Sequence, residues 1–357
     1  IDRLPPEDKR LLQIAAVVGK NVSPAIMGLA ADVPAEALRE GLTRLTKAEF
    51  LDETGTSAET EYTSRHALTH DVAYGSLLQE RRRDLHVRIV DAIERRHTDR
   101  LDDHVERLAH HALHGEIFPE ALGYLRRAGL KAITRAAHRE AVLWFEQALT
   151  ALARTPESRP RAELAVDLRL DLRASLVSLG ELERTLTCLA EAESLAAALD
   201  DQGRLGRVFG ALIGTLYLTG QHDRALEAGW RALTLARTLE DLTLRVSTNT
   251  YLGQVNHALG NYREAAAFFR DNVGSLVGGL ARERLGLPQL PSVHSRTCLV
   301  WSLAELGEFE EARAIGEEGI RIAEAAGQPA SLTVGYSGLG MLHVRFGELA
   351  AAIALLA

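Results

Sequence analysis

The sequence is poor in cysteine and in long apolar runs. Its 357 residues include two cysteines, Cys188 and Cys298, which lie far apart within helical patterns. Isolated thiols suit a reducing compartment, and we expect both side chains in the core. No apolar run is long enough to span a membrane, and no signal peptide opens the chain. The sequence therefore predicts a cytoplasmic location without membrane contact.

Basic charge is also scarce. The chain has 41 Lys and Arg against 49 Asp and Glu, a formal net charge of −8. Phosphate backbones bind concentrated basic surface, so this balance disfavours nucleic acid as a partner. Aromatic residues make up only 5% of the chain, whereas apolar residues make up 46%, mostly leucine and alanine. This composition is typical of packed helices joined by short turns.

Motifs of catalysis are missing as well. Gly19-Lys20 resembles the end of a phosphate-binding loop, but Ile14 stands where that loop needs glycine and Asn21 where it needs serine or threonine. The patterns GxSxG, CxxC and HExxH do not occur. Without a convergent nucleophile, base or metal set, we predict that the chain is not an enzyme and carries no catalytic residue, metal or cofactor.

The histidine and arginine clusters are weak evidence for functional sites. His66 and His70 have the i, i+4 spacing that can hold a metal on a helix, but no third ligand is evident nearby. We read Arg81-Arg82-Arg83 as a solvated or interdomain face, with an acidic partner surface or phosphate as the alternative. A further group is predicted to form polar helix surface: His104, His110, His111 and His114.

A repeated signature organises the rest of the chain. Its glycines step by 40, 40, 47 and 40 residues, and a small residue follows each by five positions; they are Gly180, Gly220, Gly260, Gly307 and Gly347. Such a period predicts a solenoid of helix pairs in which glycine ends each first helix in the left-handed region. The pattern resembles the tetratricopeptide repeat (TPR), with Gly253, Gly260, Tyr262, Ala265 and Phe269 fitting one consensus unit.

The first hundred residues show no such period. Three short helices and a β-hairpin with its turn near Gly55 form the order of a winged helix. The third helix carries three acidic and three basic residues, so it offers no basic face for DNA. Continuous helix is expected over 67–96, and again over 102–114. We therefore predict a mainly α protein: a winged-helix module over 1–98, then a right-handed superhelix of repeats of about 40 residues over 99–357, truncated at its C-terminus.

One segment points to a family. Residues 62–86, from Tyr62-Thr63-Ser64-Arg65-His66 to Asp84-Leu85-His86, resemble the region after the ATPase core in bacterial signalling ATPases of the STAND type, especially those fused to a class III adenylate or guanylate cyclase. The resemblance implies an upstream ATPase domain in the same chain. It also implies that His66 contacts a phosphate of the nucleotide bound there, although Ser64 replaces the phenylalanine of the family's Phe-x-His pattern.

These observations predict a non-catalytic sensor region that binds a protein, a peptide or a small effector in the repeat groove and relays binding to the ATPase. The alternative is the sensor region of an ATPase-type DNA-binding transcription activator. Trp144 and Trp230 are expected to pack between helices, and the insertion over 274–293, whose prolines would end a helix, is either a tolerated loop or a docking loop. Spacing places these side chains in the groove: Tyr217, Asn249, Gln254, His257, His294 and Trp301.

Overall fold

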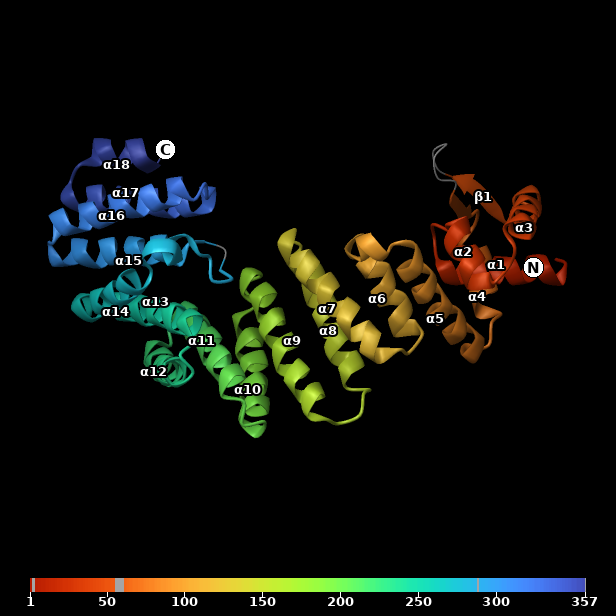
Figure 1. The fold of residues 1–357 in the computed structure, drawn as a ribbon, viewed down its shortest axis with the longest axis horizontal. Coiled ribbons are helices and arrows are strands. Elements are labelled where there is room, and N and C mark those ends of the chain that lie inside the picture. Colours follow the sequence, from red (N-terminus) through yellow and green to blue (C-terminus); the bar gives the residue numbers. More distant parts are fainter. Residues whose placement is uncertain (2–3, 55–60, 288, 357) are drawn as a thin grey trace. The chain divides into compact units, whose positions relative to one another are not determined.

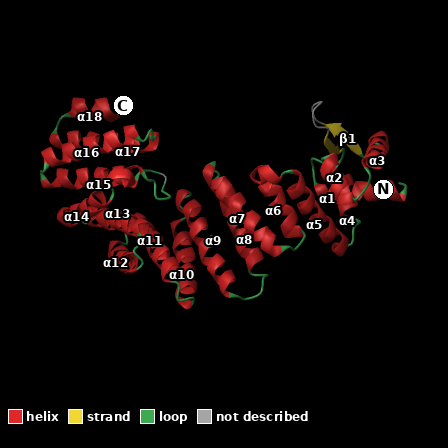
Figure 2. Ribbon diagram, in the orientation of Figure 1, coloured by secondary structure: helices red, strands yellow, loops and turns green. Residues whose placement is uncertain are grey.

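The computed structural model describes residues 1, 4–54, 61–287 and 289–356. These residues form eighteen α-helices and one two-stranded sheet (Figure 2). Within them, no helix is both long and apolar enough to cross a membrane. The chain divides into two compact units, Ile1–Arg161 and Ala162–Ala357 (Figure 1). The module boundary predicted between residues 98 and 99 stays a prediction.

The first unit opens with three helices and a hairpin. Strand β1 pairs antiparallel with β2, with Leu51 opposite Ser64. Val22, between the first two helices, adds a bridge to the hairpin, because it exchanges both backbone hydrogen bonds with Tyr62 at 2.8 and 3.0 Å. The turn predicted near Gly55 lies outside the described residues. The elements are α1 (Pro6–Val18), α2 (Pro24–Ala31), α3 (Ala35–Lys47), β1 (Leu51–Thr54) and β2 (Glu61–Ser64).

The remainder of this unit is helical, but two expected helices are broken. The single helix predicted over 67–96 was wrong, because Leu78 is extended and the preceding Leu77 turns into the core. The helix predicted over 102–114 begins only at Val105, because residues 102–104 belong to a 3₁₀ helix that ends at His104, where φ is −115°. The elements are α4 (Ala67–Gly75), α5 (Gln79–Arg96), the 3₁₀ helix η1 (Thr98–His104), α6 (Val105–His114), α7 (Phe118–Thr134) and α8 (His138–Leu152).

The second unit consists of paired helices, as the glycine period predicts. All five signature glycines have positive φ, between 71° and 88°, and follow the first helix of a pair. The pairs are α9 (Arg159–Ser178) with α10 (Leu182–Ala198), α11 (Gln202–Leu218) with α12 (His222–Thr238), α13 (Leu242–Ala258) with α14 (Tyr262–Ser275), α15 (Pro291–Leu306) with α16 (Phe309–Ala325), and α17 (Pro329–Phe346) with α18 (Leu349–Leu356).

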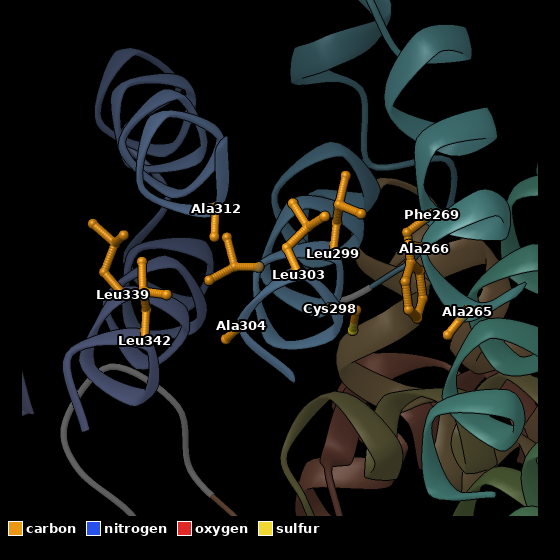
Figure 3. Packing of buried hydrophobic residues seen from close by; sticks show 11 residues of the cluster. Ala265, Ala266, Phe269, Cys298, Leu299, Leu303, Ala304, Ala312, Leu339 and Leu342 are labelled. Atoms are coloured by element: carbon orange, nitrogen blue, oxygen red, sulfur yellow. The ribbon is translucent and has the colours of Figure 1, made fainter. Parts of the chain in front are cut away.

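The small residue five positions after each glycine lets neighbouring helices approach closely. At these positions Thr185, Ala225, Ala265 and Ala312 are fully buried and Ala352 is 2% exposed. Figure 3 shows how such alanines leave room for larger side chains between α14, α15, α16 and α17. Both cysteines are buried free thiols, as expected. Each pair therefore hides its apolar face against the next one.

The extra residues of the 47-residue step lie between α14 and α15. The expectation that the prolines end the helix was wrong: α14 ends at Ser275, and Pro291 instead begins α15. A short 3₁₀ helix, η2 (Gly278–Arg282), lies between α14 and α15. The Ser292 hydroxyl donates a hydrogen bond to the carbonyl of Ala281 in η2. Leu276 and Leu290, at the two ends of the segment between α14 and α15, are buried. A docking role for this segment stays a prediction.

Candidate functional site

The first helices of successive pairs pack against one another in the second unit. Contacts join α11 to α13, α13 to α15, and α15 to α17. Their shared surface holds a cavity of about 320 Å³. We call it the inner-face pocket; it is lined by His257, Trp301, Ala304, Glu305, Met341 and Arg345.

The repeat period explains why these side chains meet. Trp301 and Met341 are 40 residues apart and occupy equivalent positions of α15 and α17, as do Glu305 and Arg345. Positions four apart on one helix lie on the same face, so Trp301 and Glu305 are neighbours. His257 contributes the matching face of α13. Three successive repeats thus build one pocket.

The pocket is apolar at its base and polar at its edge. Arg345 donates from Nε to Oε1 of Glu305 at 2.7 Å. Trp301 has a buried Nε1 that lacks a hydrogen-bond acceptor among the described residues. Leaving a buried donor unpaired costs about 1–3 kcal/mol. A ligand oxygen in the pocket can pair with this donor only if the indole turns, because Nε1 has almost no accessible surface.

His257 sits beside the indole as a neutral ring. Its Nδ1 lies 3.1 Å from Oγ of Ser302, and its ring packs edge-on against Tyr262. Burial, more than the positive charge of Arg345, lowers the pKa of His257 despite the opposing effect of Glu305. At neutral pH the imidazole can therefore both donate and accept a hydrogen bond.

Two other predicted groove residues lie on the same helices, Gln254 about one turn before His257 on α13 and His294 about two turns before Trp301 on α15. Nε2 of Gln254 lies 3.3 Å from Nε2 of His294, and Gln254 also reaches Sγ of Cys298 at 3.8 Å. Burial lowers the pKa of His294. These two side chains extend the polar edge of the inner-face pocket along α13 and α15.

Tyr217 and Asn249 lie elsewhere. Tyr217 on α11 is half-buried, with its ring 6.0 Å from that of His222. Asn249 is 2% exposed, and its amide donates to Asp271 at 2.7 Å and to Asn272 at 3.0 Å. So little exposed surface does not support a direct contact of Asn249 with a partner.

Sequence reasoning missed the polar network that Asn249 joins. Asn272 on α14 is fully buried and donates to the carbonyl of Val246, to Thr250 and to Ser295 at 2.9–3.2 Å. This network ties α13, α14 and α15 together behind the pocket. The only sequence signal was an asparagine three residues after Phe269, on the buried face of its helix.

The first unit holds a histidine cluster in which the prediction for His111 was wrong, whereas His110 and His114 are exposed as predicted. His111 is 2% exposed rather than on a polar surface, and its Nδ1 lies 2.9 Å from Nδ1 of His86, which is 1% exposed. His110 and His114 pack against the same rings, and Nε2 of His86 lies 3.2 Å from the hydroxyl of Tyr74. The signal was present, because His86 shares a helix face with the apolar residues of α5.

Two tryptophans and His66 complete the predicted set. Trp144 is half-buried, and its Nε1 lies 3.3 Å from Glu140. Trp230 packs between helices only in part, because its ring lies 5.7 Å from that of Phe268 on α14 while 53% of the residue is exposed. His66 is exposed at the N-cap of α4, and its imidazole makes no capping hydrogen bond. Within the described ranges, no group of three or more His, Cys, Asp or Glu side chains is suited to a metal ion.

Comparison with known sequences gives a partial relative. No protein-family profile matches the chain. R02095, an uncharacterised protein of Rhizobium meliloti (strain 1021), is 26% identical over 263 residues, which are 72% of this chain and 25% of that protein. The chain thus spans about a quarter of the length of the relative that it matches.

Solved structures also resemble the chain. Rap protein complexed with Competence and Sporulation Factor has a TM-score of 0.55 at 15% identity, covering 98% of this chain and 86% of Rap. The apo form of RapI has a TM-score of 0.50 at 10% identity, covering 66% of this chain and 94% of RapI. The fold is that of a TPR-like helical-repeat protein. At these identities the likeness concerns the fold alone.

Proposed function

We propose that this chain is the non-catalytic sensor region of a multidomain signalling ATPase, and that it binds a peptide segment in the inner-face pocket. The observation that carries the proposal is the buried Nε1 of Trp301, which has no acceptor among the described residues. The Trp301 side chain lines a cavity built from three repeats, together with the paired Glu305 and Arg345. A pocket of this kind combines apolar surface for a ligand's side chain with oriented hydrogen-bond donors and acceptors.

A peptide fits these features better than a metal or a reactive substrate. The volume of about 320 Å³ suits one or two side chains, and a peptide backbone supplies the carbonyl oxygens that an indole N–H lacks. Gln254 and His294 continue the polar edge, so a longer segment gains further contacts. Rap, a protein of similar fold, was crystallised with Competence and Sporulation Factor, which is consistent with a ligand-binding superhelix.

Residues 1–98 are proposed to be a winged-helix module that transmits binding to an upstream ATPase. The order of α1, α2, α3 and the hairpin, with the Val22 bridge between the first two helices, supports this arrangement. The imidazole of His66 is exposed, so it can contact a phosphate of a nucleotide bound to an upstream ATPase domain. A P-loop ATPase encoded upstream of Ile1 is the expected genomic context, and an unrelated upstream domain would contradict this part of the proposal.

DNA is not a proposed partner of this module. Arg44 on α3 donates from Nε and Nη2 to Asp8, which is 2% exposed. Arg39 is paired with Glu36 on the same helix. Because carboxylates match both arginines, α3 keeps one unmatched basic side chain among the described residues, Lys47, which falls short of the concentrated positive charge that phosphate contacts require.

Replacing Trp301 with alanine should weaken peptide binding at least tenfold while leaving helicity intact. Peptides are first selected from a random phage-displayed library on the full chain, and their affinity is then measured by calorimetry. Trp301→Phe keeps an aromatic ring but loses the N–H, so we expect an intermediate loss of about three- to tenfold for a neutral hydrogen bond.

The matched control is Trp230→Ala, which removes an exposed tryptophan from the outer helix α12. Its affinity for the selected peptides should stay within twofold of that of the parent. Equal losses for Trp230→Ala and Trp301→Ala, or no loss for either, would place the peptide outside the inner-face pocket.

A further inference from the structure

A second cavity, of about 610 Å³, lies wholly within the first unit. Helices α5, α6 and α8 and the end of α4 line it. Three of its lining residues are arginines, namely Arg82, Arg83 and Arg154, and two are glutamates, Glu116 and Glu146. Three positive and two negative side chains leave a charge of +1, in a chain whose net charge is −8.

The arginines are only partly neutralised. Glu116 is shared, because it pairs with Arg83 and also lies 4.0 Å from Arg154. Arg82 instead places its guanidinium 5.1 Å from the centre of the Tyr74 ring, and its buried Nε has no acceptor in the part of the chain that the structure describes. A guanidinium held flat on an aromatic face keeps its remaining N–H groups available to a ligand.

The rest of the lining is apolar or neutral. Leu113, Leu143 and Ala151 supply apolar surface. Burial lowers the pKa of His86 to about 3, so this ring adds no charge to the lining, and both of its nitrogens are already hydrogen-bonded to Tyr74 and His111. The cavity is several times larger than a bare phosphate ion needs and lies in the size range of pockets for small organic molecules.

We propose that this cavity binds a small organic phosphate, with the phosphate group on Arg82, Arg83 and Arg154 and the organic body against Leu113 and Leu143. Phosphate oxygens match the planar fork of donors that arginine presents. A dianion would compete with Glu116 for Arg83 and Arg154, and it would accept hydrogen bonds from the terminal N–H groups of Arg82. The proposed site uses Arg82 and Arg83, two of the three consecutive arginines at the start of α5.

Calorimetric titration of the full chain at low salt tests the site with phenyl phosphate, phenol and inorganic phosphate. Phenyl phosphate should bind most tightly, inorganic phosphate at least threefold more weakly, and phenol not measurably. Arg82→Gln should weaken phenyl phosphate at least tenfold. Arg88→Gln, which removes an exposed arginine from the same helix, should change the affinity less than twofold.

Glu116→Gln gives a test with the opposite sign. Removing the competing carboxylate should tighten phenyl phosphate binding about three- to tenfold, whereas a variant that merely damaged the fold would weaken it. The proposal is overturned if phenyl phosphate binds no better than phenol. It is also overturned if Arg82→Gln and Arg88→Gln have equal effects, or if Glu116→Gln weakens binding while circular dichroism shows intact helices.

Discussion

Replacing Phe269 with alanine should lower the free energy of unfolding of the second unit by about 3–5 kcal/mol, the usual cost of removing a large buried aromatic side chain. Phe269 is 1% exposed and belongs to the apolar cluster between α14 and α15 (Figure 3). Its ring lies flat against Gly253 on α13, where an added Cβ would come within 2.5 Å of two ring carbons. The lost ring would leave a hole that three helices share.

Phe268→Ala is the matched control for this variant. Phe268 is the adjacent residue, but it is half-buried, and its ring lies 5.7 Å from that of the exposed Trp230. We expect its replacement to cost about 1 kcal/mol, since a partly exposed ring loses less burial. Because helical repeats can unfold in parts, hydrogen exchange of α13–α15 should be read beside urea denaturation followed by circular dichroism.

Gly253→Ala supplies the second half of a double-mutant cycle. On its own it should destabilise the protein by about 1–3 kcal/mol, because a rigid ring cannot move aside cheaply. In the Phe269→Ala background the same methyl group enters the vacated space, so its cost should fall to near zero or become favourable. Additive effects of the two changes would show that the ring and the glycine do not share one packing site.

The repeat architecture could be predicted because local rules and the global fold agree. Each signature glycine ends a helix in a conformation that L side chains adopt poorly, and each following alanine stands where two helices approach. Both features leave a strict spacing in the sequence. The breaks at Leu78 and Ser275 lacked such a signal, because each depends on an apolar side chain finding a place in the core.

The candidate site was predicted only in part, for a related reason. Aromatic and polar residues on first helices pointed to His257 and Trp301, which the structure brings together. Glu305 and Arg345 were missed, although the 40-residue period applied to Trp301 and its i+4 neighbour would have found them. Periodicity says which face of a helix points inward, but it does not say which polar side chains from different helices meet there. That is why the buried Asn272 and the His86–His111 pair were not foreseen.

Acidification should destabilise the first unit through that histidine pair. Burial, reinforced by the charges of neighbouring histidines and of Arg82, lowers the pKa of His86 to about 3; burial and the charges of His86, His110 and Arg107 lower that of His111 to about 2. The two Nδ1 atoms lie 2.9 Å apart, so one donates to the other, and the accepting nitrogen must be unprotonated. Burial of both rings opposes a positive charge on either of them.

The sign follows from proton linkage. Above the unfolded pKa of about 6.5, both states carry neutral rings and the pair adds no pH dependence. Below it, the unfolded chain binds protons at these histidines but the folded chain does not. The free energy of unfolding therefore falls as the pH falls. Each histidine should cost about 2 kcal/mol between about pH 7.5 and about pH 5.

Urea denaturation followed by the fluorescence of Trp144 measures this loss in the full chain. Trp144 is the tryptophan of the first unit, so Trp230→Phe and Trp301→Phe are introduced to silence the second unit. His111→Asn should reduce the pH dependence by about half, and combining it with His86→Asn should remove most of the remainder. A pH dependence that is unchanged in the double variant would mean that other groups drive acid unfolding, and that the pair is readily protonated in the folded protein.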